Sequence, residues 1–168
     1  MVEIGVEYIN YDEKMSPRDR RSHEHNVAYG LLFNMLKKHF GIEQPTILKT
    51  ENGKPYIELD GVHFSISHTG GLCACAVANT PVGIDCEYVK SRDKEDMLRF
   101  AKRYFTENEI ALLEKGGYCP TDFYKIWTAK ESCIKKRGTN MGDVKKIDIT
   151  KENIQFFCEN GYIISINI

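Results

Sequence analysis

Apolar and polar residues alternate with the period of β-strands in several short segments and repeat at helical spacing in longer ones. Residues 1–9 alternate as a strand does, and apolar residues between His25 and Phe40 recur at helical spacing until Gly41 ends the pattern. The polar residues 10–24 predict a loop that leads into this helix. Strand-like segments then follow, separated by turn pairs such as Asn52-Gly53, at residues 47–50, 55–59, 62–67, 73–78 and 82–87.

The second half of the chain shows the same order of helices followed by strands. Helices are predicted over residues 94–104, from 106 onward and over 122–136. The middle helix begins with a capping box that pairs Thr106 with Glu109. A hairpin is predicted across Asn160-Gly161, between residues 154–158 and 162–166, because this dipeptide suits the positive φ angles of a tight turn. The shared order suggests a repeat, although the two halves have no visible sequence identity.

Composition and charge narrow the class of protein. A chain of 168 residues suits one compact unit, and a net charge of −1 gives no general case for binding nucleic acid or membranes. The start of the chain lacks the basic and apolar regions of a signal peptide, and no window has the length of a membrane span. The six cysteines show neither zinc spacing nor a disulfide framework, and residues 73–78 use cysteine as a small apolar residue. We therefore expect a cytoplasmic, reducing setting.

Two polar segments carry the candidate chemistry. Asp85 and Glu87 are two apart at the end of a strand, so their side chains are expected to share one face. Glu131 and Lys135 are four apart on the flank of an apolar helix stripe, and Lys130 lies inside that stripe. Three carboxylates without histidine or thiolate suit Mg²⁺ on phosphate oxygens better than Zn²⁺. A pyrophosphate is the natural substrate of such a site, whereas either segment alone is as well explained by solvated charges.

Five segments, in this order, resemble the 4′-phosphopantetheinyl transferases of the single-chain, two-lobe kind: residues 53–55, 64–69, 82–87, 105–109 and 127–135. The resemblance implies an α+β fold of two similar small lobes, each a helix packed on an antiparallel sheet, related by pseudo-twofold symmetry. The lobes would be residues 1–88 and 89–168, with the site between them. It also implies transfer of the 4′-phosphopantetheine arm of coenzyme A to a serine of an acyl or peptidyl carrier protein, releasing adenosine 3′,5′-bisphosphate.

The same resemblance implies roles for the charged residues. Asp85, Glu87 and Glu131 would hold Mg²⁺ on the pyrophosphate of coenzyme A. Glu131 or a metal-bound water would take the proton of the carrier serine. Lys135 would stabilise or protonate the leaving phosphate, and Lys130 would lie along the pyrophosphate, with a snorkelling side chain as its alternative.

Further contacts to coenzyme A are implied at Lys54, Pro55, Ser67 and His68. For Ser67 the alternative is turn capping, and for His68 a hydrogen bond to the backbone. Glu109 matches a family acid near the site, but its capping box accounts for it, and Trp127 is expected mainly to fill the core.

One position departs from the family. Aligned on Gly30, Asn26 stands where the family has an arginine for the 3′-phosphate of coenzyme A. Nearby basic residues that could replace its charge are Arg18, Arg20, Arg21, His23 and His25, although a run of this kind is by default a solvated surface. The chain is also shorter than typical two-lobe members after the Trp127 helix.

Three other readings remain open at this point. The short carrier-protein synthases assemble as trimers and place their metal aspartate near the N-terminus, whereas a whole lobe precedes Asp85, so a monomer is predicted. A Mg²⁺-dependent nucleotide pyrophosphohydrolase would use the same carboxylates and lysines without a carrier. A member that binds coenzyme A or a carrier protein without transfer is the alternative outside enzymes.

Overall fold

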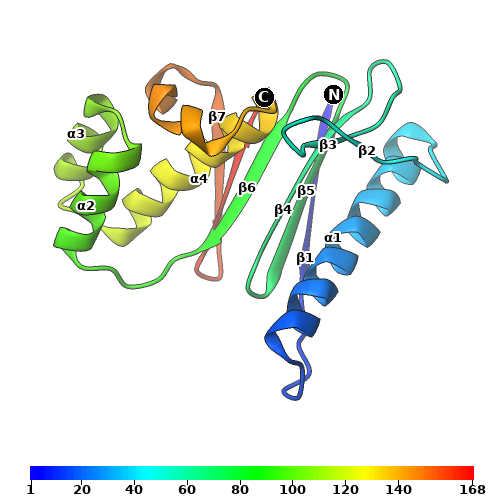
Figure 1. Ribbon diagram of the computed structural model, residues 1–168, viewed down its shortest axis with the longest axis horizontal. Helices are drawn as coiled ribbons and strands as arrows, with labels where there is room; N and C mark the ends of the chain where they lie inside the picture. Colours follow the sequence, from blue (N-terminus) through cyan, green and yellow to red (C-terminus); the bar gives the residue numbers. More distant parts are fainter.

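The computed structural model describes all residues, 1–168, as an α+β fold, which confirms the predicted fold class (Figure 1). The helices are α1 (Pro17–Phe40), α2 (Lys94–Tyr104), α3 (Glu107–Lys115) and α4 (Pro120–Arg137), with short 3₁₀ helices η1 (Met141–Lys146) and η2 (Ile149–Lys151). The strands are β1 (Val2–Tyr8), β2 (Leu48–Lys49), β3 (Pro55–Tyr56), β4 (His63–Thr69), β5 (Leu72–Ala78), β6 (Gly83–Tyr88), β7 (Ile154–Glu159) and β8 (Tyr162–Asn167).

Two three-stranded antiparallel sheets form the centre of the molecule, in the orders β1-β5-β4 and β6-β8-β7. In Figure 1, α1 flanks the first sheet and α4 packs on the second, with α2 and α3 beyond it. Strand β6, which ends the predicted first lobe of residues 1–88, pairs with β8 of the second sheet, and the division of the chain after residue 88 stays a prediction. Each sheet thus has one long helix on it, and the pseudo-twofold relation between the halves stays a prediction.

The two sheets meet where β4 lies beside β6. Ser65 and Ser67 are two apart on β4, so their hydroxyls point the same way. The Ser65 hydroxyl accepts a hydrogen bond from the backbone N–H of Ile84 at 3.0 Å, and the Ser67 hydroxyl accepts one from that of Cys86 at 3.4 Å. Side-chain hydroxyls therefore satisfy backbone donors of β6 that no neighbouring strand takes up.

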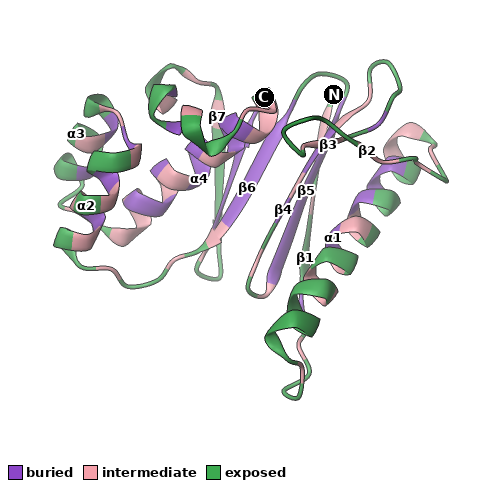
Figure 2. Ribbon diagram, viewed as in Figure 1, coloured by how far each residue is buried: buried purple, intermediate pink, exposed green.

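The core between the sheets is built from small and branched apolar residues. All seven residues of β5 are buried, which confirms the prediction that Cys73 and Cys75 belong to a buried strand (Figure 2). Alanines of β5 face isoleucines of β6 and β8 in one apolar cluster. A second cluster lies between α1 and the first sheet, and a third joins α2, α3 and α4. Trp127 packs against that third cluster, with its ring 4.8 Å from Phe100, so it lies in the core, within the second half of the chain rather than between the halves.

Helix α4 lies unusually close to β6. A Cβ atom added to Gly83 would stand 1.9 Å from the carbonyl oxygen of Ser132 and 2.5 Å from the backbone nitrogen of Lys136. Only a residue without a side chain allows this approach. The close packing brings the polar flank of α4 against β6, the strand that carries Asp85.

Several local predictions are confirmed and one is wrong. The capping box of α3 is present, and the hairpin turn has positive φ at Asn160 and Gly161. Helix α1, however, begins at Pro17 instead of His25. The hydroxyl of Ser16 caps it by accepting from the N–H of Asp19, and proline is well suited to the first helical position. This first part is mainly exposed, so it lacks the apolar repeat on which the prediction relied.

Candidate active site

A cleft of about 340 Å³ is lined by residues of α1, β4, β6 and α4 together with the β2–β3 segment. The acidic residues Asp85, Glu87 and Glu131 all line it, and so does Lys135. Period two on β6 and period four on α4 place these side chains on faces that meet, as the sequence predicts. The structure therefore brings together the three carboxylates and one of the three candidate lysines, Lys135.

Asp85 is the buried centre of this group, with only 4% of its side chain exposed. Its Oδ1 accepts hydrogen bonds from the Ser67 hydroxyl and from the Lys135 ammonium, each at 2.7 Å. Its Oδ2 is buried without a hydrogen-bond partner. Since a buried carboxylate oxygen is costly to leave unsatisfied, Oδ2 is a strong candidate to contact a ligand or a cation.

The other two carboxylates hold their protons more tightly than usual. Burial, with the nearby charge of Asp85, raises the pKa of Glu131 from 4.5 to about 7. Burial and the same neighbour also raise the pKa of Glu87, whose Oε2 is 3.4 Å from the hydroxyl of Thr69. The site therefore carries an excess of negative charge that a bound cation would offset.

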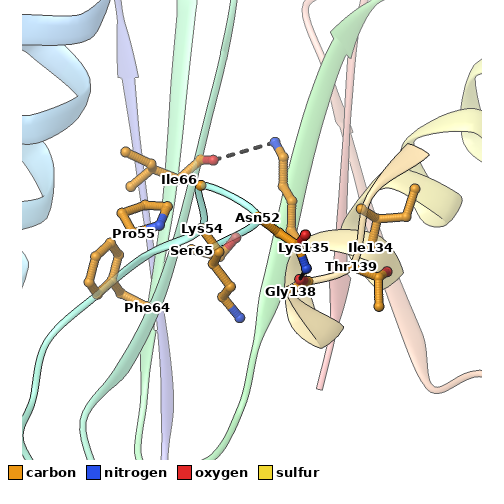
Figure 3. Close-up of a pocket in the computed structure, with 11 residues that line it drawn as sticks. Asn52, Lys54, Pro55, Phe64, Ser65, Ile66, Ile134, Lys135, Gly138 and Thr139 are labelled. Atoms are coloured by element: carbon orange, nitrogen blue, oxygen red, sulfur yellow. Dashed lines mark hydrogen bonds between the residues drawn. The ribbon is translucent and has the colours of Figure 1, made fainter. Parts of the chain in front are cut away.

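Lys135 keeps its charge in this setting. Burial acts to lower its pKa, but the charge and hydrogen bond of Asp85, with the charge of Glu131, outweigh burial and raise it. Its ammonium also lies 3.4 Å from the carbonyl oxygen of Ile66 (Figure 3). A fixed ammonium beside a carboxylate cleft is suited to neutralise charge on phosphate oxygens.

The side chains that line the cleft are suited to bind a hard divalent cation. They offer carboxylate oxygens, one of which is buried and has no hydrogen-bond partner. No three side chains of His, Cys, Asp or Glu are yet arranged around a common point. The ammonium of Lys135 occupies Oδ1 of Asp85 instead. Closing a cation site would require rotation of the glutamate side chains toward Oδ2.

Lys130 does not belong to this group, which corrects the prediction that it lies along a pyrophosphate. Its side chain is fully buried and forms an ion pair with Glu109 at 2.6 Å. The ammonium also donates to the carbonyl oxygen of Ile147 at 2.5 Å. Glu109 additionally accepts from the N–H of Thr106 and of Ile149, so both residues tie α4 to α3 and the 3₁₀ segment. A buried ammonium group needs partners of this kind. The ion pair with Glu109 therefore explains why a lysine stands in the apolar stripe of α4.

Lys54 and Pro55 lie beside a neighbouring cavity of about 230 Å³ that also reaches Lys135. Pro55 lines both hollows. The ammonium of Lys54 donates to the carbonyl oxygen of Lys136 at 2.9 Å, near the end of α4, and burial lowers its pKa. Figure 3 shows the two ammonium groups, of Lys54 and Lys135, at opposite ends of this cavity. The structure therefore separates Lys54 from the carboxylates.

Some of the remaining predicted residues line the carboxylate cleft, and others lie outside it. Ser67 and His68 line the carboxylate cleft, and the hydroxyl of Ser67 is committed to Asp85. Of the basic residues near Asn26, only His25 lines it, whereas Asn26 itself is exposed outside it. The candidates that lie elsewhere are Arg18, Arg20, Arg21 and His23.

Sequence reasoning missed two lining residues, Tyr29 and Lys49. Tyr29 follows His25 by one helical turn, and their rings lie 4.4 Å apart, so the spacing on α1 is a signal that could have linked them. Lys49 belongs to a two-residue strand, for which the sequence carries no pattern.

Comparisons with known proteins identify a family for this chain. A family model described as the 4′-phosphopantetheinyl transferase superfamily matches residues 81–165. The 4′-phosphopantetheinyl transferase gsp of Aneurinibacillus migulanus is 39% identical over 95 residues, covering 55% of this chain and 38% of that protein. A 4′-phosphopantetheinyl transferase of Bacillus subtilis is 36% identical over 139 residues, covering 77% and 60%. The 4′-phosphopantetheinyl transferase HetI of Nostoc is 32% identical over 146 residues, covering 79% and 58%. The chain thus matches well under two thirds of the length of these relatives.

Proposed function

Because this chain belongs to the 4′-phosphopantetheinyl transferase superfamily, we propose that it transfers the 4′-phosphopantetheine arm of coenzyme A to a serine of an acyl or peptidyl carrier protein. Adenosine 3′,5′-bisphosphate is the other product. The observation that carries the proposal is the meeting of Asp85, Glu131 and Lys135 in one cleft. No helix of the chain has the length and apolar character needed to cross a bilayer. We further propose that the protein acts as a monomer.

The proposal includes a Mg²⁺ site held by Asp85, Glu87 and Glu131. The cation, when bound, would neutralise charge on the pyrophosphate oxygens of coenzyme A. The support for these ligands is the unpartnered Oδ2 of Asp85 and the raised pKa of both glutamates, which burial beside Asp85 causes.

The transfer exchanges the phosphoanhydride bond of the pyrophosphate for a phosphoester bond to the serine. The hydroxyl oxygen of the carrier serine bonds to the phosphorus that carries the pantetheine, and the bond from that phosphorus to the adenosine bisphosphate breaks. In this proposal Glu131 accepts the serine proton; its pKa of about 7, raised mainly by burial, supports the role because it is matched to neutral pH. Lys135 offsets the charge that appears on the leaving phosphate, and its position in the carboxylate cleft supports this role.

Intact-mass spectrometry of apo carrier proteins tests the proposal. An apo acyl carrier protein and an apo peptidyl carrier protein would each be incubated with the protein, coenzyme A and Mg²⁺. The expected result is a mass gain of one phosphopantetheine on at least one carrier, lost when a chelator is added. The Glu131→Gln variant should give no gain, whereas Glu51→Gln, a change at an exposed carboxylate in the β2–β3 turn, should react as the parent does.

Two results would contradict the proposed transfer. Consumption of coenzyme A in the absence of any carrier would indicate a pyrophosphohydrolase. Binding of coenzyme A in calorimetry with no mass gain on a panel of acyl and peptidyl carriers would indicate a binding protein. Elution from gel filtration at the mass of a trimer would refute the monomer.

A further inference from the structure

A glutamate on α1 lies behind the histidine of the cleft. Oε2 of Glu24 is 3.3 Å from Nδ1 of His68, and its other oxygen, Oε1, accepts a hydrogen bond from the hydroxyl of Tyr11. The Tyr11 oxygen in turn accepts from the backbone N–H of Gly71 at 2.8 Å, in the turn between β4 and β5. A continuous chain of contacts therefore runs from the backbone of the first sheet to the imidazole.

We propose that Glu24 is a positioning residue that holds His68 so that its Nε2 binds a phosphate of coenzyme A. The inference rests on the proposed function in taking coenzyme A as the ligand. Because Nδ1 lies 3.3 Å from the carboxylate of Glu24, Nε2 is the ring nitrogen left for the cleft that His68 lines.

The imidazole of His68 needs a partner that holds its orientation. One third of the His68 side chain is exposed, at 34%, so the imidazole has room to rotate without a partner. The side chain of Glu24 is mostly buried, with 16% exposed, and it accepts a hydrogen bond from Tyr11. Burial and the bond to Glu24 raise the pKa of Tyr11 to about 12, so its hydroxyl remains a donor to that carboxylate at any physiological pH. Each member of the chain is thus held by the one behind it.

The negative charge of Glu24 makes it possible to distinguish positioning of His68 from a direct electrostatic effect on the ligand. Glu24 is an anion near a cleft that would bind phosphates, so by charge alone it would weaken binding, and removing it would strengthen binding. Acting through His68, it strengthens binding, and its removal weakens it. Other charged groups near the network are Arg20, over the Tyr11 ring at 5.4 Å, and Glu7, near Cys73, and neither forms an ion pair with His68.

Calorimetric titration with coenzyme A, together with steady-state kinetics, tests the role of Glu24. The Glu24→Gln variant removes the charge with little change of shape, and we expect its Kd and KM for coenzyme A to rise about fivefold to tenfold while kcat stays within about twofold. The matched control is Glu43→Gln. Glu43 lies just beyond the end of α1 and is paired with Lys37, so its replacement should leave Kd unchanged. Tyr11→Phe should weaken binding in the same direction by a smaller factor, and it serves as the second variant if Glu24→Gln folds poorly.

A double-mutant cycle with His68→Ala shows whether Glu24 acts through the histidine. In the His68→Ala background, Glu24→Gln should have no further effect on Kd. Dephospho-coenzyme A, which lacks the 3′-phosphate, identifies the phosphate concerned. If the effect of Glu24→Gln disappears with this ligand, His68 binds the 3′-phosphate; if it persists, His68 binds the pyrophosphate.

The inference is overturned if Glu24→Gln binds coenzyme A as tightly as the parent or more tightly, or if its effect is equally large without His68. These outcomes are separate from the proposed function, because transfer by the parent protein is measured first and on carriers. A parent that transfers normally beside an unaffected Glu24→Gln variant would refute this role alone. A parent that binds coenzyme A but transfers nothing would refute the transfer and leave the role of Glu24 testable by Kd.

Discussion

Replacing Glu131 by glutamine should make the metal-free protein more stable, and should do so mainly at alkaline pH. Burial and the charge of Asp85 raise the pKa of Glu131 from 4.5 to about 7, so the folded protein binds this proton more tightly than the unfolded chain does. At a pH below the pKa of the group in the unfolded chain, a carboxyl whose pKa is raised by folding does not lower the free energy of unfolding. The cost develops as pH rises from 4.5 to about 7 and is complete above that.

The size of the effect follows from the two pKa values. Each tenfold change in proton affinity corresponds to about 1.4 kcal/mol, so the full cost of ionising Glu131 is about 3 kcal/mol. Linkage gives about 1 kcal/mol of this cost near pH 5 and all of it near pH 8. The Glu131→Gln variant avoids the charge, and its advantage in free energy of unfolding should therefore grow by about 2 kcal/mol between these conditions.

Urea unfolding of both proteins at the two pH values, with chelator present, measures this difference. The Glu51→Gln variant, at an exposed carboxylate, controls for the loss of one charge. Adding Mg²⁺ should stabilise the parent and shrink the advantage of the variant, because the cation offsets the crowded carboxylates. An advantage that is equal near pH 5 and near pH 8 would refute the electrostatic account of the site.

Three further changes probe the supports of the site. Lys130→Met should lower the free energy of unfolding by about 3–5 kcal/mol, because it leaves the Glu109 charge buried and unpaired, and adding Glu109→Gln should restore part of this loss in urea unfolding. Gly83→Ala should cost about 3 kcal/mol and reduce transfer, since its Cβ would overlap the Ser132 carbonyl at 1.9 Å, and a melting temperature equal to that of the parent would contradict this packing. Lys135→Met should lower kcat by about a hundredfold or more with little change in KM, and a rise in KM alone would limit the lysine to binding.

Local spacing was enough to predict the charged centre of the site. Asp85 and Glu87 share a face because strand side chains alternate, and Glu131 and Lys135 share one because a helix returns after four residues. These relations hold inside single elements and need no knowledge of tertiary packing. The contact between the two pairs depends on α4 lying on β6, and Gly83 is the sequence feature that permits it.

The role of Lys130 could not be predicted in the same way. It lies beside Glu131 in sequence, and its place in an apolar stripe marks it as unusual without saying which partner it meets. Its partners are a carboxylate 21 residues away and the carbonyl oxygen of Ile147, 17 residues away, both brought to α4 by packing of α3 and the 3₁₀ segment. A local pattern contains no information on such contacts, and the start of α1 was missed for a related reason, because a capping serine and a proline define it without apolar residues.

The residues of the cleft come from two parts of the chain. The carboxylates and Lys135 fall within residues 81–165, where the family model matches, whereas His68 and Glu24 lie on β4 and α1, before that region. The chain matches only 38% to 60% of the length of the relatives compared here. The two walls of the cleft are joined by the hydrogen bond from Ser67 to Asp85 and by that from Lys135 to the carbonyl oxygen of Ile66. Transfer should therefore depend on residues from both walls, since Glu24→Gln should raise KM for coenzyme A and Lys135→Met should lower kcat. A variant of either wall that transfers as the parent does would show that this wall takes no part in the reaction.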